Sequence, residues 1–295
     1  MTNESGAAQS AEAMALRCME IWGGNHGVDQ AASMPGIDVY VHSTPYQGGD
    51  SGGDIYYISQ CGAGNIARVV LADVAGHGTS VADLALSLQR LMRKNINTMD
   101  QTRFARDLNS EFDAINTAGR FATALLATYW APTNHLILVN AGHPPPLRYS
   151  QKEGRWLAIE RGSIDGEEVP NLPLGIIAPT EYSQDAIGLD PGDKVLMYTD
   201  ALVEADMGNG AQLGVSGLLN LIEKVDLSEP ERITSQVRER VREIRGGADA
   251  EDDETLILLE HNGVEAPRQS LGEKLSMLGR MAGLAPVFRG ELAKG

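Results

Sequence analysis

Residues 66–78 read IARVVLADVAGHG, and this stretch is the most informative about the fold. An apolar, β-branched run ends on Asp73, two glycines follow, and a helical pattern begins at Thr79. β-Branched residues are typical of strands, and glycine allows tight changes of chain direction. The stretch therefore predicts a buried strand that ends on a carboxylate and passes through a flexible segment into a helix.

Working outward, the same criteria predict a mixed set of strands and helices. Gly27–Gly36 reads as a loop, and an order without regular β-α-β alternation favours an α+β fold with antiparallel sheet. The predicted strands are 37–41, 55–59, 66–72, 121–130, 136–140, 147–149, 156–159, 194–199 and 255–260. The predicted helices are 11–22, 79–94, 100–116, 215–225 and 228–246.

These elements suggest three parts. Residues 1–36 are expected to be an N-terminal extension with a short helix, and 37–260 a single domain. Residues 261–295 form a C-terminal tail, in which Leu271, Leu275 and Leu278 have helical spacing. A helix packed on its own domain is the favoured reading of the tail, and a helix for a partner or a membrane surface is the alternative.

Composition and charge exclude several classes of protein. Of 295 residues, 42% are hydrophobic and 22% charged, which argues against a collagen, a coiled coil or a wholly disordered chain. No apolar run approaches the ~20 residues of a membrane-spanning helix. The net charge of −16 argues against binding nucleic acid through its phosphates. Two cysteines and an N-terminus unlike a signal peptide indicate a cytoplasmic protein.

Aspartates recur at the ends of predicted strands. Asp54 opens one strand, Asp73 and Asp200 each follow one, and Asp252 and Asp253 precede the last. Carboxylate, carbonyl and water oxygens are the ligands that Mg²⁺ and Mn²⁺ prefer, and a pair of such ions can activate water for attack on phosphorus. Most single aspartates at such positions are turn or cap residues, and spacing alone favours that reading.

Eight short motifs, taken in their order along the chain, indicate a protein family. Together they resemble the bacterial sporulation stage-II-E type of metal-dependent serine/threonine protein phosphatases, relatives of the type 2C phosphatases. The resemblance covers about 37–260. The motifs are GGD (52–54), DVAGHG (73–78), FATA (121–124), NAGHPPP (140–146), LPLG (172–175), PGD (191–193), YTD (198–200) and DDETL (252–256).

The resemblance implies two antiparallel β-sheets packed face to face and flanked by helices. It also implies two Mn²⁺ or Mg²⁺ ions at one edge. Asp54 and Asp73 would bridge the ions and act in catalysis through a metal-activated water. The remaining ligands would be the Val74 carbonyl, Asp200 and Asp252.

Several positions leave alternatives open. Asp50 belongs to a second glycine-aspartate pair, and Asp253 is the second choice for the late ligand. His77 is read mainly as a shaping residue of its loop, with substrate contact as the alternative. The family usually has glycine where Ala201 stands, and no arginine or lysine in 37–54 offers a phosphate ligand.

The leading functional hypothesis is hydrolysis of phosphoserine or phosphothreonine on a protein. The resemblance suggests that the substrate is an anti-sigma factor antagonist in a partner-switching pathway. No sensor domain is recognisable before residue 37, so control is expected from a regulatory partner, from the termini or from oligomerisation such as a homodimer. The alternatives are a catalytically weak phosphatase-like module that sequesters a phosphoprotein, and a calcium-stabilised structural protein. Retention of the four aspartates argues against the first alternative, and the absence of regular calcium-loop spacing argues against the second.

Overall fold

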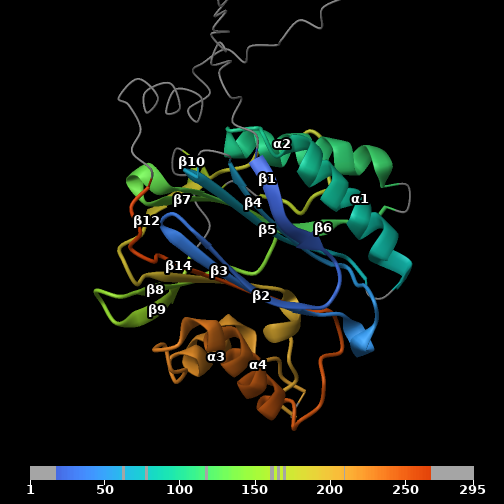
Figure 1. Ribbon diagram of the computed structural model, residues 1–295. Helices are drawn as coiled ribbons and strands as arrows, with labels where there is room; N and C mark the ends of the chain where they lie inside the picture. The colour runs from blue at the N-terminus through green and yellow to red at the C-terminus, as the bar shows by residue number, and fades with distance from the viewer. Residues whose placement is uncertain are drawn as a thin grey trace, which may run out of the picture.

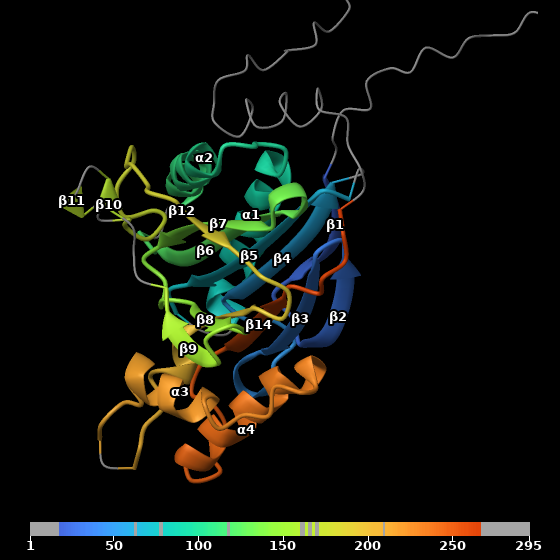
Figure 2. The same ribbon diagram turned by 90° about the vertical axis from the view of Figure 1, so that its left-hand side faces the viewer.

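Two six-stranded antiparallel sheets form the centre of the molecule (Figures 1 and 2). The computed structural model describes residues 18–61, 64–76, 79–116, 119–159, 163–164, 167–168, 171–208 and 210–266. The first sheet contains, in spatial order, β1 (Cys18–Gly24), β4 (Asp54–Cys61), β5 (Ile66–Val74), β6 (Ala122–Trp130), β7 (His135–Ala141) and β12 (Asp185–Gly188). The second contains β2 (Val28–Met34), β3 (Ile37–Thr44), β14 (Glu254–Glu260), β13 (Lys194–Tyr198), β8 (Leu147–Ser150) and β9 (Arg155–Ala158).

Helices cover the outer face of each sheet. In Figure 1, α1 (Thr79–Asn95) and α2 (Gln101–Ile115) lie above the first sheet, while α3 (Gly214–Ile222) and α4 (Ile233–Ile244) lie below the second. Minor elements are the pair β10 (Ser163–Ile164) and β11 (Glu167–Glu168), and the 3-10 helices η1 (Tyr46–Gly48), η2 (Ala131–Thr133), η3 (Asp200–Leu202) and η4 (Pro230–Arg232). The predicted α+β class with two face-to-face antiparallel sheets is confirmed.

Three apolar layers hold this stack together, and the strand sequences explain why. Along β4, Ile55 and Tyr57 face the helices, whereas Tyr56 and Ile58 face the second sheet. A strand that is buried on both faces has no polar side, so it reads as a continuous apolar run. The third layer packs the second sheet against α3 and α4.

The N-terminal part differs from the prediction. A helix was expected over 11–22, but residues 18–24 form β1, which pairs with β4, and the expected loop at 27–36 contains β2, which pairs with β3. Residues 11–17 lie outside the described part of the chain. Both sheets therefore include strands that precede residue 37. Tertiary pairing with β4 outweighs the local helical spacing of β1.

The polypeptide stays attached to the second sheet just beyond β14. His261 donates its backbone N–H to Asp193 O (2.9 Å), and the Asn262 side chain donates to Met34 O (2.9 Å). The tail helix expected further on lies outside the described residues.

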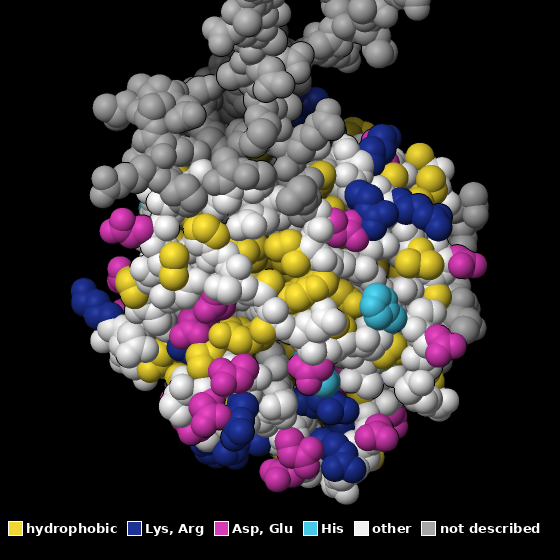
Figure 3. Space-filling view, viewed as in Figure 1, with side chains coloured by type: hydrophobic (Ala, Val, Ile, Leu, Met, Phe, Trp, Pro, Cys, Tyr) yellow, Lys and Arg dark blue, Asp and Glu magenta, His cyan; other side chains and the backbone are white. Residues whose placement is uncertain are grey.

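On the face shown in Figure 3, hydrophobic side chains gather across the middle, at the level between the two sheets of Figure 1. Ile21, Trp22 and Val28, from the edge strands β1 and β2, pack against the core between the sheets and remain partly exposed. Within the described residues, no helix has the length and apolar character needed to cross a membrane.

Candidate metal centre

The ends of four central strands meet at one edge of the sandwich. Asp54 and Asp73 lie directly opposite each other in the β4–β5 ladder. From the second sheet, Thr199 donates its hydroxyl to Asp54 Oδ2 (2.9 Å). This hydrogen bond joins the sheets at the point where Asp200 follows β13, so the two sheets bring their acidic strand ends together.

Asp54 is the most enclosed of these carboxylates, with 3% of its surface exposed. Burial raises its pKa well above the ordinary value, and the neighbouring Asp73 charge adds to the rise. Hydrogen bonds from Thr255 and Thr199 act in the opposite direction. The Thr199 hydroxyl also accepts the backbone N–H of Thr255 (3.0 Å), which fixes its orientation toward Asp54.

The pKa of Asp73 shows that other carboxylates lie close to it. Burial raises its pKa to about 8, and the charges of Asp200, Asp252, Asp253 and Glu204 contribute further, in that order. Burial and Glu204 likewise raise the pKa of Asp200. The structure thus brings Asp54, Asp73, Asp200 and Asp252 into one electrostatic cluster. Glu204, an exposed side chain four residues after Asp200, was not anticipated from the sequence.

Asp253 serves a different purpose. Its Oδ1 accepts the backbone N–H of Tyr46 (2.7 Å), and its Oδ2 accepts that of Gly53 (2.6 Å). A Cβ on Gly52 would collide with the same carboxylate, so the glycine allows this close approach. Asp253 holds the loop before Asp54 in place, whereas Asp252 has an intermediate exposure beside it. Asp50 is exposed.

The backbone around Val74 approaches Gly53 closely. Val74 is the last residue of β5, and its N–H donates to Gly53 O (3.3 Å). A Cβ added to Gly53 would lie 2.9 Å from Val74 O and 3.0 Å from Gly76 O. Two carbonyl oxygens therefore face a space that any other side chain would fill.

His143 ties three strands of the site together. It is 2% exposed, and its Nε2 lies 2.9 Å from Tyr198 O, which can only accept, so Nε2 carries the proton. Nδ1 then accepts from the Thr123 hydroxyl (2.7 Å), and Thr123 lies opposite Asp73 in the β5–β6 ladder. Burial lowers the pKa of His143 to about 4, so the ring is neutral near pH 7. This agrees with a structural interpretation of His143.

Arg120, which precedes β6, contacts the loop after Asp73, a contact that the sequence did not reveal. Arg120 Nη1 donates to Ala75 O (2.7 Å), and Ala75 donates its N–H to Phe121 O (2.9 Å). Gly76 has a φ of 109°, and a Cβ there would lie 2.5 Å from Arg120 Nη1. His77 lies outside the described residues.

Ala201 lies within η3 and is buried, where the family usually has glycine. It is not among the described residues with a positive φ, so the backbone here does not require glycine.

The donor set suits hard divalent cations. The Asp73 charge raises the pKa of Asp54, the charges of Asp200 and Asp252 raise that of Asp73, and an added cation would relieve this repulsion. The carbonyl oxygens of Val74 and Gly76 lie close to Gly53, and they are of the same ligand type. In the part of the chain that the structure describes, no group of three or more His, Cys, Asp or Glu side chains already has the geometry to hold an ion.

Known proteins resemble this chain in sequence and in structure. Two Bacillus subtilis (strain 168) proteins align with this chain. Phosphoserine phosphatase RsbU is 26% identical over 194 residues, covering 65% of this chain and 55% of RsbU. Phosphoserine phosphatase RsbP is 25% identical over 173 residues, covering 57% of this chain and 40% of RsbP. The chain thus spans about half or less of the length of these relatives.

Solved structures show the same fold. The RsbU and RsbW domains of a Mycobacterium tuberculosis protein match with a TM-score of 0.67 at 19% identity, covering 88% of this chain and 72% of that one. The PP2C phosphatase domain of SpoIIE from Bacillus subtilis, with a fragment of its regulatory domain, matches with a TM-score of 0.65 at 16% identity. That match covers 79% of this chain and 70% of the other. The family model for stage II sporulation protein E (SpoIIE) matches residues 64–262, about two thirds of the sequence, and the chain therefore belongs to this family.

Proposed function

We propose that the chain is a metal-dependent protein phosphatase that hydrolyses phosphoserine or phosphothreonine. The observation that carries this proposal is the carboxylate cluster at the sheet edge, where Asp73 has a pKa of about 8 beside Asp200 and Asp252. The printed names of RsbU and RsbP, both phosphoserine phosphatases, support the same reaction class.

In this proposal, Asp54 and Asp73 would hold two divalent cations, Mn²⁺ or Mg²⁺. The Val74 carbonyl, Asp200 and Asp252 would supply the remaining protein ligands. Support for a divalent metal comes from solved neighbours, since RsbX was determined with magnesium and the PstP catalytic domain with two manganese ions. When bound, the ions would neutralise the phosphoryl oxygens and activate water for in-line attack.

The protein's own contribution is to hold the ligands in position. Thr199 fixes one oxygen of Asp54, while Asp253 fixes the Gly52–Gly53 segment that carries Asp54. His143 connects Thr123, opposite Asp73, with Tyr198, two residues before Asp200. The strands thus fix the carboxylates before a substrate arrives, which lowers the cost of reorganisation during the reaction.

The proposed substrate is a phosphorylated regulatory protein, namely an anti-sigma factor antagonist in a partner-switching pathway. Such a substrate would place the reaction in the cytoplasm. Control would come from a regulatory partner or from a second copy of this chain. The structural neighbour that combines RsbU and RsbW domains, and the one from a study of the bacterial stressosome, support this setting.

Phosphate release from a phosphoserine peptide tests the proposal, with Asp54→Asn and Asp50→Asn as a matched pair. Asp54→Asn should lower the Mn²⁺-dependent rate at least about 100-fold, because an electrostatic contribution to the transition state is lost. Asp50→Asn should remain close to wild type, because that side chain is exposed. A rate for Asp54→Asn equal to that of wild type would rule out the assigned site. No hydrolysis by the wild-type protein would support a binding module instead.

A further inference from the structure

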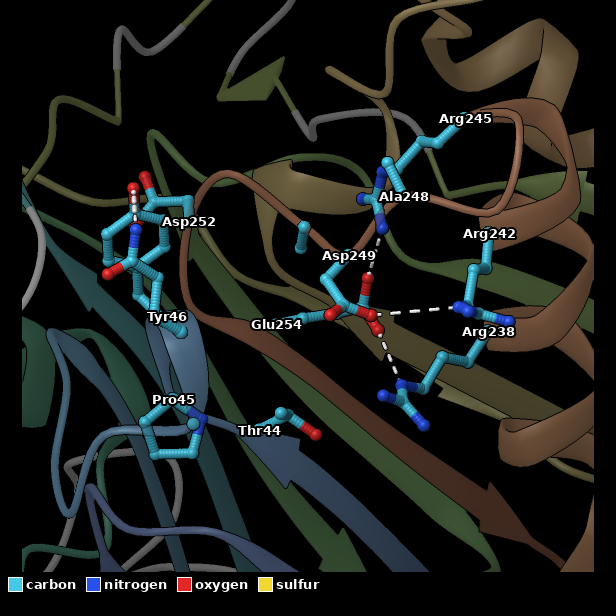
Figure 4. A pocket seen from close by; sticks show the side chains of 13 residues that line it. Thr44, Pro45, Tyr46, Arg238, Arg242, Arg245, Ala248, Asp249, Asp252 and Glu254 are labelled. Atoms are coloured by element: carbon cyan, nitrogen blue, oxygen red, sulfur yellow. Dashed lines mark hydrogen bonds and ion pairs between the residues drawn. The ribbon is translucent and has the colours of Figure 1, made fainter.

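A cavity of about 470 Å³ adjoins the carboxylate cluster (Figure 4). Asp252 lines it, so the cavity begins where one candidate metal ligand lies. One wall is the segment Thr44–Gly48, and the other is formed by α4 and the connection from α4 to β14. The cavity is therefore continuous with the edge at which phosphoryl chemistry is proposed.

Two arginines of α4 and its C-cap residue, Arg245, line the second wall. Arg238, Arg242 and Arg245 are spaced by four and three residues, which places them on one face of the helix. Figure 4 shows their guanidinium groups converging on Glu254 and Asp249, while Tyr46 and Asp252 lie toward the other side. This grouping of arginines stands out in a chain whose net charge is −16.

Two of these arginines share a single acid. Glu254, which is 3% exposed, accepts from Arg238 Nε (3.0 Å) and from Arg245 Nη1 (2.8 Å). Arg245 also donates Nη2 to Ala201 O (2.6 Å), next to Asp200. Glu254 thus serves two guanidinium groups, and with Asp249 and Asp252 the cavity lining holds three arginines and three acids.

Arg242 is held less firmly. Its guanidinium lies 3.6 Å from Asp249 and 3.6 Å from Glu239, longer than a hydrogen-bonded ion pair. The side chains of Asp249 and Glu239 are 88% and 60% exposed, so water screens both contacts strongly. An incoming carboxylate can replace such contacts at little cost.

We propose that this cavity binds an acidic side chain of the substrate polypeptide, within a few residues of the phosphoserine, through Arg242. The proposal rests on the phosphatase function proposed above. Because an extended chain advances ~3.3–3.6 Å per residue, a flanking residue can reach a cavity that shares Asp252 with the site. Arginine binds carboxylates in a planar two-bonded geometry.

The test compares phosphoserine peptides that differ only at flanking positions, which carry glutamate, glutamine or lysine. Wild-type protein should show a kcat/KM about fivefold higher for the glutamate peptide than for the glutamine peptide, as expected for a partly exposed ion pair. Arg242→Glu should lose this preference and favour the lysine peptide. Arg240→Glu is the matched control, since Arg240 is on the same helix but does not line the cavity, and it should keep the wild-type preference.

Hydrolysis of p-nitrophenyl phosphate, measured on the same proteins, separates the possible failures. If the wild-type protein hydrolyses this ester but shows no preference among the peptides, the cavity inference is wrong and the phosphatase function stands. If Arg242→Glu slows the ester as much as the glutamate peptide, the cavity contacts the phosphoryl group rather than a flanking residue, which also overturns the inference. If the wild-type protein hydrolyses neither the ester nor any peptide with Mn²⁺, the proposed function fails and the inference with it.

Discussion

Asp252 and Asp253 are adjacent in the chain but differ in what their carboxylates contact. Both oxygens of Asp253 accept backbone N–H groups from the segment before β4. Asp252 Oδ1 accepts the backbone N–H of Asp253 (2.8 Å), and its charge acts on Asp73. Asp253 is thus placed to stabilise the fold, whereas Asp252 is the proposed metal ligand.

Substituting these two residues should therefore give opposite results. Asp253→Asn should lower the free energy of unfolding by about 1–3 kcal/mol, because an amide nitrogen cannot accept a backbone N–H. Asp252→Asn should leave that free energy near wild type and lower Mn²⁺-dependent hydrolysis by about 100-fold. Urea unfolding in chelator and phosphate release measure the two effects. Equal loss of stability in both variants would contradict the division of roles.

His143 gives a pH dependence with a defined sign. Its pKa is about 4 in the folded protein, against 6.5 ordinarily, so the unfolded state binds more protons between these values. The stabilisation is present above pH 6.5 and is lost as the pH falls toward 4. Between pH 7 and pH 5, the free energy of unfolding of wild type should fall by about 2 kcal/mol more than that of His143→Gln. Parallel pH profiles for the two proteins would show that His143 is not buried in the neutral form.

At the scale of elements, the segment from Gly52 to β4 depends on glycine where two backbones approach. At Gly53 the neighbours of an added Cβ would be two carbonyl oxygens, and backbone cannot yield as a flexible side chain does. At Gly27 the nearest atom to an added Cβ is Pro45 Cδ at 3.5 Å, an ordinary contact distance. Gly27 is therefore a suitable control for substitution of Gly53 by alanine.

Gly53→Ala should lower the free energy of unfolding by about 1–3 kcal/mol through overpacking, and it should also reduce hydrolysis, because Val74 O and Asp54 would shift. Gly27→Ala should change stability by less than about 0.5 kcal/mol. Thermal unfolding and phosphate release measure both effects. A Gly53→Ala protein with wild-type stability and rate would show that the carbonyl space is not needed.

The elements that the sequence predicted are those with a strong local signal. β4, β5, β6 and β14 are apolar runs because both faces are buried, and α1 and α2 have clear helical spacing. β2 was missed because its sequence, VDQAASM, lacks a β-branched run and regular alternation, as expected for a largely exposed edge strand. The Pro35-Gly36 pair that closes the hairpin to β3 is a turn signal that could have revealed it.

The site was only partly predictable for a related reason. Strand-end aspartates stand out in the sequence, but the groups that orient them come from distant segments. Thr199 and Asp54 are 145 residues apart, and Tyr198 and His143 are 55 apart. No local pattern encodes such contacts, since they arise only when the two sheets pack together.

At the scale of the whole molecule, the acidic cluster lies where the two sheets meet. Asp54 and Asp73 belong to the first sheet, and Asp200 and Asp252 flank strands of the second. Repulsion among these carboxylates opposes the packing of the sheets, and a bound cation would favour it. Metal binding and global stability should therefore be coupled.

Adding Mn²⁺ at about 100 times its dissociation constant should stabilise the wild-type protein by about 2.7 kcal/mol per site. Asp73→Asn should lose most of this gain, and in chelator it should melt at or above the wild-type temperature because one repelling charge is gone. Asp50→Asn should respond like wild type. Calorimetry with and without chelator measures the shift in melting temperature. An Mn²⁺ response of Asp73→Asn identical to that of wild type would show that the metal does not bind at this cluster.

The most direct test of the central claim is the rate of phosphate release from a phosphoserine peptide as a function of Mn²⁺ concentration, for wild type and Asp73→Asn. We predict a rate that rises from zero in chelator and saturates for wild type, and no comparable rise for Asp73→Asn at any Mn²⁺ concentration. Hydrolysis by wild type that persists in chelator, or the same Mn²⁺ dependence in Asp73→Asn, would contradict a metal centre at this edge of the sheets.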